Sequence, residues 1–167
     1  MKLLVNISSI GARPTGLGVY ALRCARAVSS ALQAEIVAAS GVAGLEDVVL
    51  RAPASCALGA GRSAAIRRWA WSKRQRHSPE RLVYSPTHHA FGRRGDQVLT
   101  IHDLIPLRFP KQHPTQHLYF RFGLAAELAR APALFTVSET SRQDIHEHYR
   151  YPLERIFVVP NGVDRQV

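Results

Sequence analysis

The chain has 167 residues, 46% of them hydrophobic and 20% charged, which is typical of a folded globular protein and excludes a disordered one. Its 22 basic residues outnumber the 12 acidic ones, and the formal net charge of +10 predicts an anionic partner: nucleic acid, anionic lipid or a phosphorylated small molecule. No run approaches the roughly 18 consecutive apolar residues of a membrane-spanning helix, so none is predicted.

The chain opens on an apolar run that predicts a β-strand over residues 2–7 and is too short for a signal peptide with its cleavage site. Six further runs predict strands at residues 34–39, 48–50, 82–84, 98–101, 133–137 and 156–159. Helical patterns lie at residues 19–32, 62–77, 115–130 and 138–149. The alternation predicts an α/β fold, a Rossmann-like three-layer α/β/α domain with a mostly parallel sheet of about seven strands.

Two of the helical patterns carry finer predictions. Over residues 115–130, helical spacing suggests a buried stripe, which consists of Leu118, Phe122, Ala125 and Ala129. At the start of the helix over residues 138–149, Ser141 followed by Asp144 resembles a capping box.

A loop rich in glycine, serine and proline, residues 8–18, joins the first strand to the first helix and contains Gly11, Gly16 and Gly18. Glycines let the backbone approach a ligand closely, and a helix N-terminus favours an anion. The loop therefore predicts a diphosphate ligand. A purely structural turn is the alternative. The third glycine of a dinucleotide fingerprint and an acidic residue ending the second strand are both missing, which speaks against a dinucleotide-binding oxidoreductase.

Polar side chains follow two of the predicted strands. His102 and Asp103 come directly after the strand over residues 98–101, where open α/β sheets bind ligands, and His102 could donate to a sugar hydroxyl or a phosphate. Its alternative role is capping a loop, and for Asp103 an Asx turn is the favoured interpretation. His88 and His89 follow the strand over residues 82–84 and could reach the same cleft.

The sequence predicts no metal ion and no cofactor. Adjacent histidines point in different directions, and no cysteine or carboxylate completes a set of zinc ligands. The two cysteines, Cys24 and Cys56, form no metal-binding spacing and no disulfide framework, and a reducing cytoplasm is the simplest context.

The segment over residues 62–77 is strongly basic and contains two tryptophans. Three interpretations stay open: an interfacial helix that binds anionic lipid, a single-stranded nucleic-acid site, or a solvated helix whose tryptophans pack on the sheet. The residues assigned to membrane or lipid contact are Arg67, Arg68, Trp69, Trp71, Lys73 and Arg74.

Four motifs, taken in order, cover nearly the whole chain: PTGLGVYALRCARAV, VYSPTHHA, VLTIHDLIPLRFP and LFTVSETSRQDIHEHYRYPLERIFVVPNGVD. With them the sequence resembles the N-terminal domain of retaining GT-B glycosyltransferases of family 4, which include bacterial mannosyl-, glucosyl- and rhamnosyltransferases. The last motif is the most specific, and the glycine loop alone is a weak signal.

The resemblance implies two Rossmann-like domains with the active site in the cleft between them. Residues 1–167 would form the N-terminal, acceptor-side domain, and the donor-binding C-terminal domain with its acidic donor motif and basic diphosphate clamp would be absent. We therefore expect the chain to fold alone but to transfer no sugar alone.

The resemblance also implies residue roles. His102 would be the catalytic residue, in contact with the donor sugar near the reacting centre. Residues at the donor diphosphate or substrate would be Gly16, Leu17, Gly18, Ser138 and Glu139. Residues at the acceptor would be His88, His89 and Asp103. Residues at the crossing into the second domain would be Asn161, Gly162 and Asp164.

The implied reaction moves a hexose from a nucleotide-sugar with retention of configuration, the leaving diphosphate helping to deprotonate the acceptor hydroxyl, without a metal. The acceptor would be a glycan or a polyprenyl-diphosphate-linked sugar, in bacterial polysaccharide or glycolipid synthesis. We expect a cytoplasmic protein with peripheral contact at the inner face of the membrane. The alternatives are a dinucleotide-binding oxidoreductase domain and a basic nucleic-acid-binding module, and no nucleic-acid partner is expected.

Overall fold

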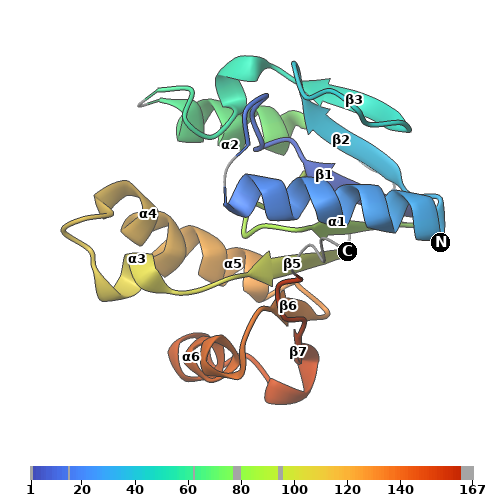
Figure 1. The fold of residues 1–167 in the computed structure, drawn as a ribbon. Helices are drawn as coiled ribbons and strands as arrows, with labels where there is room; N and C mark the ends of the chain where they lie inside the picture. Colours follow the sequence, from blue (N-terminus) through green and yellow to red (C-terminus); the bar gives the residue numbers. More distant parts are fainter. Residues whose placement is uncertain (1, 15, 62, 77–79, 94–95, 163–167) are drawn as a thin grey trace. The chain divides into compact units, whose positions relative to one another are not determined.

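A computed structural model describes the chain except for residues 1, 15, 62, 77–79, 94–95 and 163–167. Its strands form a seven-stranded sheet in the order β3-β2-β1-β4-β5-β6-β7, and the strand pairs whose register is described all run parallel. This confirms the predicted parallel α/β sheet. The chain divides into two compact units, residues 1–99 and 100–167, which are described in turn (Figure 1).

The first unit contains five of the strands, two α-helices and a short 3-10 turn. Their bounds are β1 Lys2–Ile7, α1 Leu17–Leu32, β2 Glu35–Ala39, β3 Val48–Ala52, η1 Ala54–Cys56, α2 Ala64–Arg74, β4 Arg81–Ser85 and β5 Gln97–Ile101. The last two residues of β5 belong to the second unit. All five residues of β5 are buried, as expected for a strand inside a parallel sheet.

Alternation along β1 gives this unit two packed faces. Val5 and Ile7 lie in one apolar cluster with Ala21 and Ala25 of α1. Leu4 points to the opposite face, because successive side chains of a strand alternate. There it belongs to a second cluster, formed by Leu4, Val37, Val83 and Phe91 with Trp71 of α2 packed against it.

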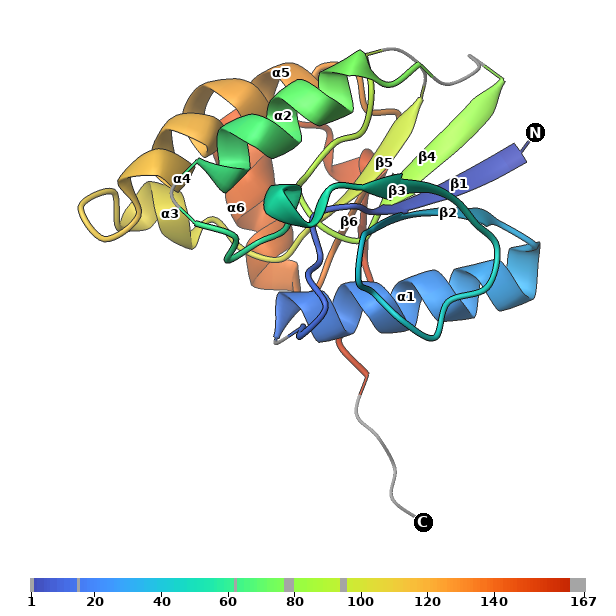
Figure 2. The same cartoon turned by 90° about the horizontal axis from the view of Figure 1, so that it is seen from above.

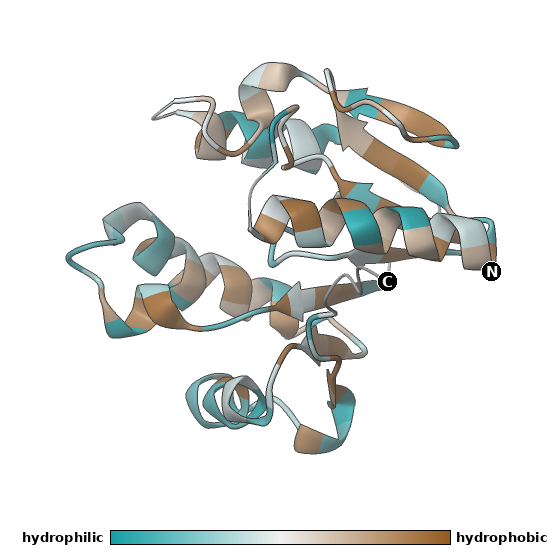
Figure 3. Ribbon diagram, viewed as in Figure 1, coloured by the Kyte–Doolittle hydropathy of each residue, from teal (hydrophilic) through white to brown (hydrophobic). Residues whose placement is uncertain are grey.

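The two helices of the first unit therefore cover opposite faces of its strands. Figure 2 shows α1 and α2 on either side of β1 and β2, and Figure 3 shows the apolar colouring along β2 between them. This is the three-layer α/β/α arrangement that the alternation of strands and helices predicts.

The second unit follows the end of β5 with short helices and two short strands. Their bounds are α3 Ile105–Arg108, α4 Pro114–Leu118, η2 Tyr119–Leu124, α5 Ala125–Leu128, β6 Leu134–Thr136, α6 Glu139–Tyr149, η3 Leu153–Arg155 and β7 Ile156–Val158. Within this unit the Thr136 hydroxyl donates to the Ile101 carbonyl at 2.7 Å, which holds β6 beside the end of β5.

The helix predicted over residues 115–130 is a run of α4, the π-helical segment η2 and α5. Its predicted stripe is wrong: Leu118 and Phe122 are 59% and 62% exposed, whereas Phe120, Leu124 and Leu128 are buried. The run carries two apolar stripes offset by two residues, which places them on roughly opposite faces of a helix. The pattern alone gives no reason to prefer the correct one.

The cap of α6 also differs from the prediction. The N-cap is Ser138, whose hydroxyl accepts from the Ser141 backbone N–H at 3.1 Å, so the helix begins three residues before the predicted box at Ser141 and Asp144. Ser141 is instead buried in the first turn, where its own hydroxyl has a partner described below. The serine pair gave a cap signal at either position, and only the packed structure distinguishes them.

Candidate functional site

The glycine loop of the first unit ends at an uncapped helix. Gly16 is the N-cap of α1 with φ 46° and ψ −110°, a backbone conformation that only glycine adopts readily. No side chain among the described residues caps α1, and its first turn contains no acidic residue. An uncapped helix N-terminus of this kind favours an anion, and the assignment of Gly16, Leu17 and Gly18 to a diphosphate stays a prediction.

Gly18 has a different reason to be glycine. A Cβ at this position would lie 2.9 Å from the Pro14 Cβ and 3.3 Å from the Ile10 Cγ2. The loop therefore packs directly on the first turn of α1, and Gly18 lets it do so. By contrast, a Cβ on Gly16 would meet nothing within 4 Å, so the space beside the helix N-terminus is open.

A buried polar network joins the ends of β1 and β4. The Asn6 side-chain amide donates to the Ser85 hydroxyl at 2.9 Å and to the His89 carbonyl at 3.0 Å. Its oxygen accepts from the Ser8 hydroxyl at 2.7 Å. Asn6, Ser8 and Ser85 are each at most 2% exposed, so the network fixes the loop after β4 from within. Asn6 was not among the predicted site residues, although a polar residue inside the apolar run over residues 2–7 was a signal.

His88 and His89 lie together on this loop, with ring centroids 4.1 Å apart. Burial lowers the pKa of His89 well below the ordinary histidine value, and the charges of His88 and Arg68 lower it further. His89 is therefore neutral near pH 7, and a ligand contact by either histidine of this loop stays a prediction.

The depressed pKa of His89 predicts acid-sensitive stability. The unfolded chain binds a proton at this histidine from about pH 6.5 downward, whereas the folded chain does not, so the free energy of unfolding falls as pH drops below that value. In His89→Gln the free energy of unfolding should fall less steeply with decreasing pH, by up to about 1.4 kcal/mol per pH unit. Urea unfolding of both proteins from pH 7 to pH 5 measures the two slopes. Equal slopes in the two proteins would contradict the assignment.

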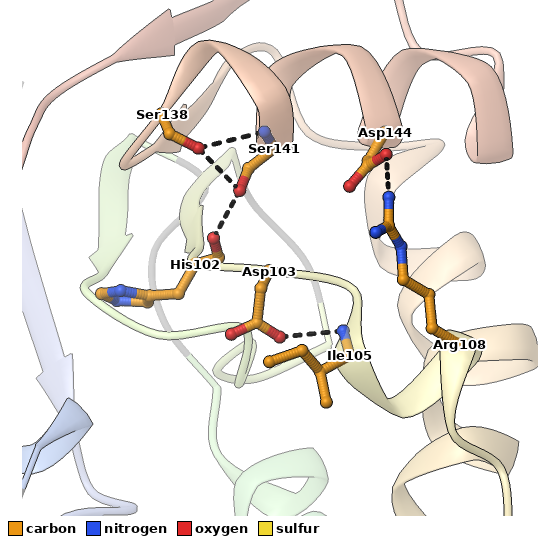
Figure 4. A network of polar contacts seen from close by, with 7 residues as sticks. All are labelled: His102, Asp103, Ile105, Arg108, Ser138, Ser141 and Asp144. Atoms are coloured by element: carbon orange, nitrogen blue, oxygen red, sulfur yellow. Dashed lines mark hydrogen bonds and ion pairs between the residues drawn. The ribbon is translucent and has the colours of Figure 1, made fainter.

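His102 follows β5 in the second unit, and its backbone is held firmly. Its carbonyl accepts from the Ser141 hydroxyl at 2.8 Å, and the Ser138 and Ser141 hydroxyls lie 3.0 Å apart. Figure 4 shows the imidazole pointing away from these two serines. The end of β5 is thus fixed to the first turn of α6, while the half-buried His102 ring points away from that turn.

Asp103 forms the predicted Asx turn. Its carboxylate accepts from the Ile105 backbone N–H at 2.9 Å at the start of α3. Three residues into that helix, Arg108 pairs with Asp144 of α6 at 2.6 Å (Figure 4). Both contacts hold the segment after β5 in place. A direct role of Asp103 at the acceptor stays a prediction.

Ser138 and Glu139 have structural partners in the described residues. The Ser138 hydroxyl caps α6, and Glu139 pairs with Arg142 at 2.9 Å while its side chain is 60% exposed. Glu139 also places negative charge in the first turn of α6, where the helix dipole favours it. Their assignment to donor binding stays a prediction.

The basic segment divides into structural and exposed residues. Arg67 donates to the Ser55 and Ala60 carbonyls, each at 3.0 Å, and contacts the Ser63 hydroxyl. Arg68 is only 9% exposed and donates to the Cys56 carbonyl at 2.9 Å.

The two tryptophans divide in the same way. Trp71 packs on Phe91 with ring centroids 5.8 Å apart. Trp69, in contrast, is 60% exposed, and Lys73 and Arg74 lie near it on α2. One tryptophan thus follows the structural interpretation and the other stays on the surface.

Three further predictions concern metal ligands, membrane-spanning helices and the residues after β7. Among the described residues no group of three histidine, cysteine or acidic side chains could hold a metal ion. In the same residues no helix is long and apolar enough to span a membrane. Asn161 and Gly162 are exposed after β7, and Asp164 lies outside the described residues.

Comparison with known proteins agrees with the motifs. The family described as Glycosyltransferase Family 4 matches residues 14–167. The O-antigen chain mannosyltransferase RfbU of Salmonella typhimurium is 25% identical over 177 residues, a match that covers 98% of this chain and 49% of that protein. The chain therefore spans about half the length of this curated relative. Because the family match covers almost all of its length, the chain belongs to glycosyltransferase family 4.

Proposed function

We propose that the protein takes part in transferring a hexose from a nucleotide-sugar to a glycan or a lipid-linked acceptor, in bacterial polysaccharide or glycolipid synthesis. The observation that carries the proposal is the open N-terminus of α1, where Gly16 leaves the helix uncapped in a chain of glycosyltransferase family 4. Amide groups placed there suit the diphosphate of a sugar donor. The mannosyltransferase named among its relatives supports a hexose as the transferred sugar.

The residue roles that we propose follow the two units. In the first, Gly16, Leu17 and Gly18 approach the donor diphosphate, and His88 and His89 lie toward the acceptor. In the second, the His102 imidazole contacts the donor sugar while its backbone is fixed by Ser141. Ser138, Glu139 and Asp103 support the substrates from the same strand ends.

The chemistry that we propose is retention of configuration. The leaving diphosphate takes the proton of the acceptor hydroxyl as the new glycosidic bond forms on the same face of the sugar. Such a reaction needs charge stabilisation and positioning more than a protein nucleophile. The His102 imidazole suits this role, because a ring N–H can donate a hydrogen bond to a sugar hydroxyl.

We also propose that a second Rossmann-like domain completes the enzyme. The match to a relative of about twice the length supports this, and residues 161–162 would lead toward that domain. The location that we propose is cytoplasmic, with peripheral contact at an anionic membrane surface through Trp69, Lys73 and Arg74. The acceptor would then be a polyprenyl-diphosphate-linked sugar at that surface.

The test compares the 167-residue chain with the complete product of its gene. Both are incubated with a panel of labelled nucleoside-diphosphate hexoses, beginning with mannose, and with polyprenyl-diphosphate-linked acceptors. We expect transfer by the complete product and none by the 167-residue chain above the level of its His102→Ala variant. NMR of the product should show a retained anomeric configuration.

Three outcomes would contradict parts of the proposal. Transfer by the 167-residue chain would contradict the need for a second domain. An inverted product would contradict the mechanism but not the activity. Failure of the complete product with every donor, while the folded protein shows no donor binding, would contradict the proposed function.

A further inference from the structure

A cavity of about 450 Å³ lies at the second half of α2, in the first unit. It is lined by Trp69, Ala70, Lys73, Arg74, Arg76 and Arg93. Four of these six residues are cationic, and none is acidic. We propose that this cavity binds the phosphate groups of an anionic ligand, at a site separate from the glycine loop.

The cavity has more cationic residues than the dipole of α2 accounts for. Cations in the last turn are favoured by the helix dipole, which accounts for Lys73 and Arg74 of α2. Arg76 lies beyond the end of the helix, and Arg93 comes from the segment before β5. Arg74 and Arg76 have no ion-pair partner among the described residues. Like charges that converge in this way repel one another, and a bound polyanion would relieve the repulsion.

The cavity is held together by buried contacts. Ser72, which is 4% exposed, donates to the Ala90 carbonyl at 3.2 Å and accepts from the Gly92 backbone N–H at 3.1 Å. The Lys73 ammonium donates to the Gly92 carbonyl at 3.3 Å. These bonds fix the segment that carries Arg93 against α2. Lys73 and the backbone directly before Arg93 are therefore held in place at the edge of the cavity.

Trp69 gives the cavity an apolar wall. Its side chain is 60% exposed, although the neighbouring Trp71 packs inward on Phe91. An exposed indole beside arginines suits a ligand that combines phosphate with a flat or apolar part. The volume lies within the roughly 300–1,000 Å³ that small-molecule sites occupy, so a diphosphate with an attached group fits.

The cavity lies apart from the glycine loop, and it shares Trp69, Lys73 and Arg74 with the proposed membrane contact, on which this inference builds. The 11 residues of α2 extend roughly 16 Å. Its first half is anchored through Arg67 and Arg68 to the carbonyls of Ser55 and Cys56, whereas the cavity begins at Trp69 and continues past the end of the helix. Binding of diphosphate at this cavity is measured without a sugar donor, so its failure is distinguishable from failure of the donor contact at Gly16.

The experiment uses Trp69 as its own reporter. The 167-residue chain contains two tryptophans, so Trp71→Phe leaves Trp69 as the single emitter while an aromatic ring is kept against Phe91. Inorganic diphosphate is titrated at constant ionic strength, and circular dichroism checks the fold of each variant. We expect a saturable change in Trp69 emission. Arg74→Gln with Arg76→Gln should weaken binding at least about tenfold, since each lost charge-assisted contact has a comparable effect.

The matched control removes the same charge elsewhere. Lys2 and Lys111 are exposed, so Lys2→Gln with Lys111→Gln lowers the net charge equally without touching the cavity. Its affinity for diphosphate should change less than about twofold, because distant exposed charges are screened by salt. Equal weakening in both double variants, or no saturable binding in the parent, would overturn the proposal.

A second arm identifies the source of the phosphate. Vesicles of phosphatidylcholine with and without phosphatidylglycerol are mixed with the same variants. The cavity is assigned to lipid headgroups if the protein binds the anionic vesicles, if diphosphate displaces it from them, and if Arg74→Gln with Arg76→Gln abolishes the binding. Saturable diphosphate binding without vesicle binding assigns it to a soluble phosphorylated ligand. Vesicle binding that is unchanged by diphosphate and by Arg74→Gln with Arg76→Gln would place the lipid contact elsewhere. If the protein also shows no saturable binding of diphosphate, the proposed site is overturned.

Discussion

His102→Ala is expected to lower kcat for sugar transfer by the complete protein by about a hundredfold, the effect of removing one preorganised donor from a reacting centre. The substitution should leave the backbone conformation at this position unchanged, because the Ser141 hydroxyl donates to the His102 carbonyl, which alanine retains. If the imidazole acts in the transition state, kcat and kcat/KM should fall together with little change in KM. Initial rates over a range of donor concentrations measure the split.

Two variants sharpen this result. His102→Gln keeps a hydrogen-bond donor and should recover part of the lost rate. His148→Ala removes an exposed histidine of α6 and should leave the rate unchanged, which controls for the loss of a ring. A rate in His102→Ala within about threefold of the parent would remove His102 from the proposed reacting centre, because a positioned acid–base or donor group contributes far more.

Gly16→Ala is expected to raise KM for the nucleotide-sugar about tenfold or more. The positive φ at Gly16 is strained for alanine, and a Cβ would occupy the open space beside the first amide groups of α1. The same strain should lower the free energy of unfolding by about 1–3 kcal/mol. Donor titration and urea unfolding on one preparation separate the two effects.

Gly44→Ala provides the matched glycine. Gly44 also has a positive φ and lies between β2 and β3. A Cβ there would meet only the guanidinium end of Arg26, which donates to the Gly44 carbonyl at 3.2 Å. It should lose similar stability with no change in KM for the donor. A rise in KM shared by both variants would show that general destabilisation, and not the helix N-terminus, explains the effect of Gly16→Ala.

Most of the fold could be read from apolar runs. The strands at residues 2–7 and 98–101 were predicted nearly to the residue, because a parallel sheet buries both faces and leaves continuous apolar runs. The helix over residues 115–130 shows where this reasoning fails. Two apolar stripes coexist there, and burial is decided by packing partners that lie far away in the sequence.

The sequence was enough to name candidate residues on the loops, but not the residues that hold those loops in place. Strand ends and glycines pointed to His102 and Gly16 because their position in an α/β sheet is general. Asn6 and Ser85 are 79 residues apart in sequence and meet through tertiary structure, so no local pattern could pair them. For the same reason, the sequence did not separate structural Arg68 from the exposed Arg74 on one helix.

The π-helical segment Tyr119–Leu124 has a consequence for aligning this chain with its relatives. A π turn accommodates one residue more than an α turn, so a homologue with a single deletion here could replace it by α-helix and keep the flanking α4 and α5 in phase. A one-residue gap over 119–124 is therefore the natural place for length variation in this helix. Alignments that force the segment through without a gap would misassign which residues face the interior.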